Sequence, residues 1–100
     1  MVKKKLSYYY FASNDETLES VVSNLLIKKN VTISIAESCT GGLVSKKLTD
    51  YPDSSKYLMG GLVAYSNEIK KEFLKVSSKT LDQKGAVSSE VALEMCNNVR

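Results

Sequence analysis

The chain has 100 residues, of which 43% are hydrophobic and 25% charged, a balance typical of a single small globular domain. Its net charge of +3 rests on lysines, and Arg100 is the one arginine, so the guanidinium groups that read base edges are nearly absent and direct nucleic-acid binding is not expected. The chain has no histidine and two well-separated cysteines, which excludes a Ser-His-Asp or Cys-His catalytic site and a Cys/His zinc site within it.

Residues 1–13 are basic and then aromatic, and they are predicted to form a tail or interdomain linker. Their start faintly imitates a secretory signal, but the apolar part is short, aromatic and without a clean cleavage site. No apolar run in the chain approaches the roughly 20 residues of a membrane span. We therefore expect a cytoplasmic protein with no membrane partner, in which Cys39 and Cys96 remain reduced thiols.

The first half of the remaining domain, residues 14–100, predicts a helix, a strand and a helix. Ser13-Asn14-Asp15-Glu16 has the pattern of a capping box, and the apolar residues behind it follow helical spacing until Lys29-Asn30. The β-branched, alternating segment Val31–Ala36 predicts a strand. A second helix is expected from Thr40 to Asp50, because Tyr51-Pro52-Asp53 then ends it.

The second half predicts a strand and two further helices. The strand runs from Tyr57 to Tyr65, with Tyr57 packing in the interior and Gly60-Gly61 allowing a bulge or a close backbone approach. Ser66 caps a helix from Asn67 to about Lys75 that buries Ile69 and Phe73. A polar loop from Ser77 to Gly85 leads to a last helix, which begins at Val87-Ser88-Ser89-Glu90 and buries Val91, Met95 and Val99.

The element order α-β-α-β-α-α predicts an α/β fold, a layered α/β/α domain around a central sheet. Two strands are too few for such a sheet, and the final helix reaches Arg100 without a glycine or proline stop. We therefore expect a domain truncated at the C-terminus and completed by segments that are not present here. A small incomplete sheet also favours a homo-oligomer.

The segment Ala36-Glu37-Ser38-Cys39-Thr40-Gly41-Gly42 joins the first strand to the second helix. Its small polar residues and paired glycines either cap the helix or also bind an anionic or polar substrate at the helix N-terminus. Cys39 is a weak candidate nucleophile, because no histidine is available as its base. Glu37 either ties down the turn by accepting N–H bonds or touches the substrate.

Three residues around the second strand are candidates for catalysis. Ser55 is either a loop serine or a nucleophile, and Lys70 is either a surface lysine or, when buried and neutral, a general base. Tyr65 either packs in the core or supplies a hydroxyl that relays a proton. A strand followed by a helix is expected to fold Ser55 and Lys70 together.

With these residues in view, the chain resembles the C-terminal domain of the competence/damage-inducible protein CinA, the nicotinamide-nucleotide amidase family. The resemblance covers residues 15–100 and rests on separated motifs in order. They are Ala36 to Gly42, Leu48-Thr49-Asp50 with Ser54-Ser55, Gly61 to Glu68, Lys70 and Gly85-Ala86-Val87-Ser88.

The resemblance implies hydrolysis of the carboxamide of nicotinamide mononucleotide to nicotinate mononucleotide and ammonia, without a metal or other cofactor. It implies a Ser/Lys mechanism with Ser55 as nucleophile, Lys70 as base and Tyr65 as an assisting hydroxyl. The turn residues Glu37, Ser38, Thr40, Gly41 and Gly42 are then expected to bind the nucleotide or to shape the pocket.

Two departures from the family pattern stand out. Pro52-Asp53 replaces a proline or alanine followed by glycine, and the family's downstream glycine-rich segment and further strands, which contribute substrate contacts, do not follow. The alternatives to an amidase are a regulatory or interaction module associated with competence and DNA damage, and a nucleotide-binding domain without catalysis.

Overall fold

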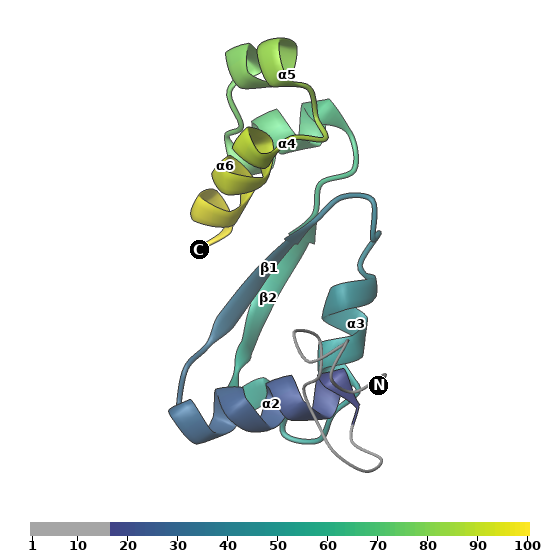
Figure 1. Ribbon diagram of the computed structural model, residues 1–100, viewed down its shortest axis with the longest axis vertical. Helices are drawn as coiled ribbons and strands as arrows, with labels where there is room; N and C mark the ends of the chain where they lie inside the picture. The colour runs from purple at the N-terminus through teal and green to yellow at the C-terminus, as the bar shows by residue number, and fades with distance from the viewer. Residues whose placement is uncertain (1–16) are drawn as a thin grey trace, which may run out of the picture.

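The computed structural model describes residues 17–100, which form five α-helices, one short 3-10 helix and two strands (Figure 1). In chain order they are α2 (Leu18–Lys29), β1 (Ile33–Glu37), α3 (Leu43–Thr49), the 3-10 helix η1 (Ser54–Lys56), β2 (Leu58–Val63), α4 (Asn67–Leu74), α5 (Ser78–Lys84) and α6 (Ser89–Val99). Helices combined with a small parallel sheet confirm the predicted α/β class.

The two strands form a parallel sheet in which Ile33 pairs with Leu58 and Glu37 with Val63. The register shifts between Ile33 and Ser34, so that Met59 is the extra residue of a bulge. Gly61 is required by the close approach of the strands, since a Cβ at this position would lie 2.5 Å from the carbonyl oxygen of Ile35. Of the two alternatives predicted for Gly60-Gly61, the close backbone approach is confirmed at Gly61, and the bulge lies one residue earlier, at Met59.

Buried side chains gather at both ends of the sheet. At the carboxyl ends of the strands, α4, α5 and α6 enclose the main core, which comprises Ala64, Leu74, Val76, Leu81, Val91 and Met95. α3 runs alongside the sheet from its carboxyl end, and at the opposite end α2 and the last turn of α3 lie near the start of β2 (Figure 1). The two helical groups are thus joined by the strands, and residues that flank one strand lie far apart.

Tyr57 organises the second of these groups. It is fully buried, and its hydroxyl donates to the carbonyl oxygen of Leu48 at 2.6 Å. Because that bond uses the only hydroxyl proton of Tyr57, the Ser23 hydroxyl donates to the Tyr57 oxygen at 2.8 Å. The expectation that Tyr57 packs in the interior is confirmed, and its hydroxyl links α2, α3 and η1.

The predicted helices differ from the structure in several details. The Ser13–Glu16 capping box lies outside the described residues, and α2 begins after Thr17, which forms a capping box with Ser20. Phe73 was expected to be buried but is 56% exposed, because α4 turns Lys70 and Leu74 inward instead.

The predicted polar loop from Ser77 to Gly85 is wrong. It folds into α5, in which the Ser77 hydroxyl accepts the N–H bonds of Lys79 and Thr80 and Leu81 is buried. The last helix agrees with the prediction, because Ser88 caps α6 and both Val91 and Met95 enter the core.

Candidate catalytic site

The candidate site lies where both strands end. In a parallel sheet the carboxyl ends of neighbouring strands share one edge, so Ser38, just after β1, comes close to Ala64 and Tyr65, just after β2. The chain then enters α4, whose N-cap is Ser66, and the first turn of this helix returns Lys70 to the same edge.

Lys70 is buried with an exposed fraction of 2% and contacts three oxygen atoms. Its Nζ donates to Ser38 Oγ at 2.9 Å, to the carbonyl oxygen of Ala64 at 2.8 Å and to that of Tyr65 at 3.0 Å. These three acceptors match the three N–H donors of an ammonium group. In the part of the chain from residue 17 onward, no salt bridge joins Lys70 to a carboxylate.

Glu37 is buried on the other side of Ser38 and acts as an internal anchor of the turn. Its Oε1 accepts bonds from the Thr40 hydroxyl at 2.7 Å and from the N–H groups of Gly42 and Val44 at 3.1 and 3.0 Å. Its Oε2 accepts bonds from the N–H and the hydroxyl of Ser45 at 2.9 and 2.6 Å. The carboxylate therefore occupies the amide groups at the start of α3.

The electrostatics of Glu37 follow from these bonds. Burial raises the pKa of Glu37, but the Ser45 and Thr40 hydroxyls and the N–H groups of Ser45 and Val44 outweigh it and lower the pKa to about 2. The Glu37 carboxylate is consequently ionised at neutral pH. Among the described residues, its hydrogen-bond donors are neutral hydroxyl and N–H groups.

The five turn residues that were predicted to bind substrate have different surroundings in the structure. Thr40 and Gly42 both donate to Glu37, which corresponds to the tying role considered for Glu37. Gly41 and Gly42 adopt positive φ angles of 61° and 105°, which permit the tight turn. Ser38 is the member of this set that lines the neighbouring cavity, together with Cys39.

The prediction that Ser55 and Lys70 of the same chain lie close together is wrong. Ser55 lies in η1 before β2, and Lys70 lies in α4 after it. The six residues of β2 place the two ends of the strand about 20 Å apart, at about 3.3 Å per residue. The serine that Lys70 does contact is Ser38, which was predicted to bind substrate or shape the pocket.

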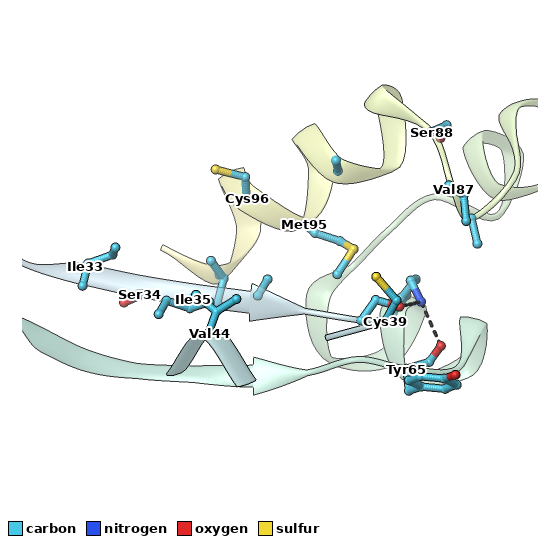
Figure 2. Close-up of a pocket in the computed structure, with 16 residues that line it drawn as sticks. Ile33, Ser34, Ile35, Cys39, Val44, Tyr65, Val87, Ser88, Met95 and Cys96 are labelled. Carbon is cyan, nitrogen blue, oxygen red and sulfur yellow. Dashed lines mark hydrogen bonds between the residues drawn. The ribbon is translucent and has the colours of Figure 1, made fainter. Parts of the chain in front are cut away.

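Tyr65 reaches Lys70 through its backbone rather than through its hydroxyl. Its carbonyl oxygen accepts the Nζ bond, while the residue is 71% exposed. Figure 2 shows Tyr65 at the end of the cavity near Cys39. The predicted role of the Tyr65 hydroxyl as a proton relay has no hydrogen bond to support it among residues 17–100.

An open cavity of about 700 Å³ extends from this site between β1 and α6. Met95 and Cys96 on α6 and Ile33 and Ile35 on β1 are among the lining residues, and Figure 2 shows Val87 and Ser88 at the start of the helix. Most of the lining side chains are apolar, and among residues 17–100 Lys70 is the one charged residue that lines the cavity. The cavity therefore suits a ligand with a flat or apolar part that presents a polar group to Ser38 and Lys70.

The described residues contain no membrane-spanning helix, no metal-binding cluster and no disulfide. None of the helices between residues 17 and 100 has the length and hydropathy needed to cross a membrane. No cluster of metal-binding side chains occurs in the same part of the chain. Cys39 and Cys96 are both exposed and free of a disulfide.

Comparisons with known proteins agree on one family. The sequence profile of the CinA C-terminal domain matches residues 15–100. A CinA-like protein of Geotalea uraniireducens (strain Rf4) is 49% identical over 98 residues, which are 98% of this chain and 23% of that protein. The chain thus spans about a quarter of the length of the curated relatives it matches.

Solved structures give the same result. The competence damage-inducible protein A of Klebsiella pneumoniae superposes with a TM-score of 0.80 at 33% identity, covering 82% of this chain and 51% of that one. A competence-damaged protein (CinA) superfamily protein from Escherichia coli superposes with a TM-score of 0.79 at 29% identity, covering 94% and 58%. The described fold is therefore about half of each of these larger structures.

Proposed function

Because the chain belongs to the CinA C-terminal domain family, we propose that its Ser38–Lys70 site hydrolyses a carboxamide, with nicotinamide mononucleotide as the substrate. The products are nicotinate mononucleotide and ammonia. The observation that carries the proposal is the 2.9 Å contact between Lys70 Nζ and Ser38 Oγ at the cavity wall.

The surroundings of Lys70 suit a neutral amine as well as an ammonium. A neutral amine has two N–H donors and one lone pair. The carbonyl oxygens of Ala64 and Tyr65 accept the two donors, which leaves the lone pair directed toward Ser38 Oγ. In this state the hydrogen bond reverses, and Ser38 donates to Lys70.

The reaction then proceeds in two halves. Lys70 accepts the Ser38 proton as Oγ attacks the amide carbon, and the tetrahedral intermediate expels ammonia with that proton. Water next attacks the acyl ester and gives a proton to Lys70, which passes it to Ser38 Oγ as the carboxylate product leaves. No metal is needed, because the serine supplies the nucleophile and the lysine moves the proton.

Two serines compete for the role of nucleophile. The family resemblance points to Ser55, whereas the contacts of Lys70 point to Ser38. Ser55 is exposed at the opposite end of β2, so it can reach Lys70 only from a second copy of the chain. We assign the nucleophile to Ser38, because this arrangement needs one chain only.

The test follows ammonia and nicotinate mononucleotide after incubation of the chain with nicotinamide mononucleotide. We expect Ser38→Ala and Lys70→Ala to lower kcat by at least about a thousandfold, as for other paired catalytic groups. The matched control is Ser55→Ala, which removes the same hydroxyl and is expected to keep the activity.

Three results would contradict parts of the proposal. Absence of ammonia release from the unsubstituted chain contradicts the amidase function, and saturable binding without turnover favours a nucleotide-binding domain. Loss of activity in Ser55→Ala, with activity kept in Ser38→Ala, contradicts the assignment to Ser38. Restored activity on mixing Ser55→Ala with Lys70→Ala places Ser55 of one copy beside Lys70 of another.

A further inference from the structure

We propose that Glu37 is a positioning residue that holds Ser38 opposite Lys70, an inference that rests on the proposed function. Glu37 makes no contact with the cavity and is 4% exposed. It immediately precedes Ser38 in the chain, so whatever fixes both its backbone and its side chain also fixes the place of the Ser38 hydroxyl.

The side chain of Glu37 is held by α3. Five donors from Thr40, Gly42, Val44 and Ser45 surround the two carboxylate oxygens at 2.6 to 3.1 Å. A carboxylate offers about four lone-pair sites, so these donors leave no acceptor capacity for a substrate. The role of Glu37 is therefore directed toward the turn and not toward a ligand.

The backbone of Glu37 is held by the segment that also holds Lys70. Its carbonyl oxygen accepts the N–H of Ala64 at 2.7 Å, and the carbonyl oxygen of Ala64 accepts Lys70 Nζ at 2.8 Å. Ala64 thus donates its N–H to Glu37 and accepts a hydrogen bond from Lys70 at its C=O. Together with the Lys70–Ser38 bond, these contacts form a closed ring through Glu37, Ala64, Lys70 and Ser38.

The turn after Ser38 completes the support. The N–H of Gly41 donates to the carbonyl oxygen of Ser38 at 3.0 Å, which closes the turn that Glu37 anchors from inside. If the carboxylate lost its donors, the start of α3 would no longer be tied to the residue before Ser38, and the turn that carries Ser38 could shift. Displacements of about 1 Å at a reacting group lower rates by as much as a hundredfold.

The experiment measures the reactivity of Ser38 without relying on the substrate. The chain is treated with a fluorophosphonate, and the labelling rate of Ser38 is read by mass spectrometry. In Glu37→Gln the side chain keeps its length, but its NH2 group faces N–H or O–H donors. We expect labelling and kcat to fall at least about tenfold with KM little changed. The matched control Glu72→Gln, at an exposed position on α4, is expected to label normally.

Each outcome decides the question. Labelling of a folded Glu37→Gln variant at the unsubstituted rate overturns the positioning role. If that variant does not fold, Ser45→Ala and Thr40→Val each remove hydroxyl bonds to the carboxylate, and unchanged labelling in both overturns the role. Partial recovery in Glu37→Asp, which keeps the charge but is one methylene shorter, supports it. Labelling of Ser38 without ammonia release overturns the substrate assignment alone, and no labelling of the unsubstituted chain overturns the nucleophile as well.

Discussion

Two buried ionisable side chains flank Ser38, and each is stabilised by neutral groups. Lys70 donates to one hydroxyl and two carbonyl oxygens, and Glu37 accepts from two hydroxyls and three amides. Neither forms a salt bridge among the residues described. The side chains of Lys70 and Glu37 therefore share no hydrogen-bond partner, and each is satisfied separately.

The low pKa of Glu37 predicts a dependence of stability on pH. The pKa is about 2 in the folded chain against 4.5 for the free side chain. A depressed pKa contributes stability that is fully present above pH 4.5 and is lost as the pH falls toward 2. We expect the free energy of unfolding, measured by urea titration at several pH values, to fall over this range. The fall should be smaller in Glu37→Gln, and equal slopes in the two proteins would refute the prediction.

At the scale of helices and strands, most elements were predictable and their mutual placement was not. The capping serines Ser66 and Ser88 and the β-branched first strand indicated where elements begin. Helix α5 was missed because its segment carries a single buried apolar residue, Leu81, although Ser77 and Gly85 already had the cap pattern. Phe73 was misplaced because the helical spacing of apolar residues paired it with Ile69, whereas α4 turns Lys70 and Leu74 inward.

The pairing of the site residues was misjudged for a different physical reason. Ser55 and Lys70 are close in sequence, but one precedes β2 and the other follows it. The missing information was the parallel direction of the two strands, which brings the residue after β1 to the residues after β2. Given that direction, Ser38 and Lys70 are the natural pair, although 32 positions separate them.

The packing of α2, α3 and η1 predicts a specific loss of stability in Tyr57→Phe. The substitution removes the hydroxyl that bonds to the carbonyl oxygen of Leu48 and to Ser23, leaving two buried polar groups without partners. We expect the free energy of unfolding to fall by about 1–3 kcal/mol. Tyr51→Phe is the matched control, because its hydroxyl bond to Asn24 is exposed, and its urea midpoint should change little. Equal effects of the two substitutions would contradict this account.

At the scale of the whole molecule, the parallel sheet is incompletely covered. Parallel strands are ordinarily buried on both faces, and a two-stranded sheet is marginal alone. Along β2, however, Met59 is 61% exposed, Leu62 38% and Val63 46%. This exposed strand surface is consistent with the expected homo-oligomer, which we retain as a proposal.

Sedimentation velocity tests this proposal with two matched variants. Met59 lies on β2 and Leu93 on α6, and each is 61% exposed. If copies associate through the sheet, Met59→Lys is expected to shift the chain toward the monomer, whereas Leu93→Lys leaves its sedimentation unchanged. A monomeric unsubstituted chain, or equal effects of the two substitutions, would argue against association through β2.

The hydrogen bond from Ala64 to Glu37 also has a consequence for the order of folding. It joins strands that can pair only after the crossover between them, which includes α3 and η1, has brought their ends together. Contacts so distant in sequence form against a large loop-closure entropy and are slow to appear. Ser38 and Lys70 therefore meet only in chains that have completed this pairing, and a partly folded chain carries an unreactive serine. The reactivity of Ser38 therefore indicates whether the two strands have paired.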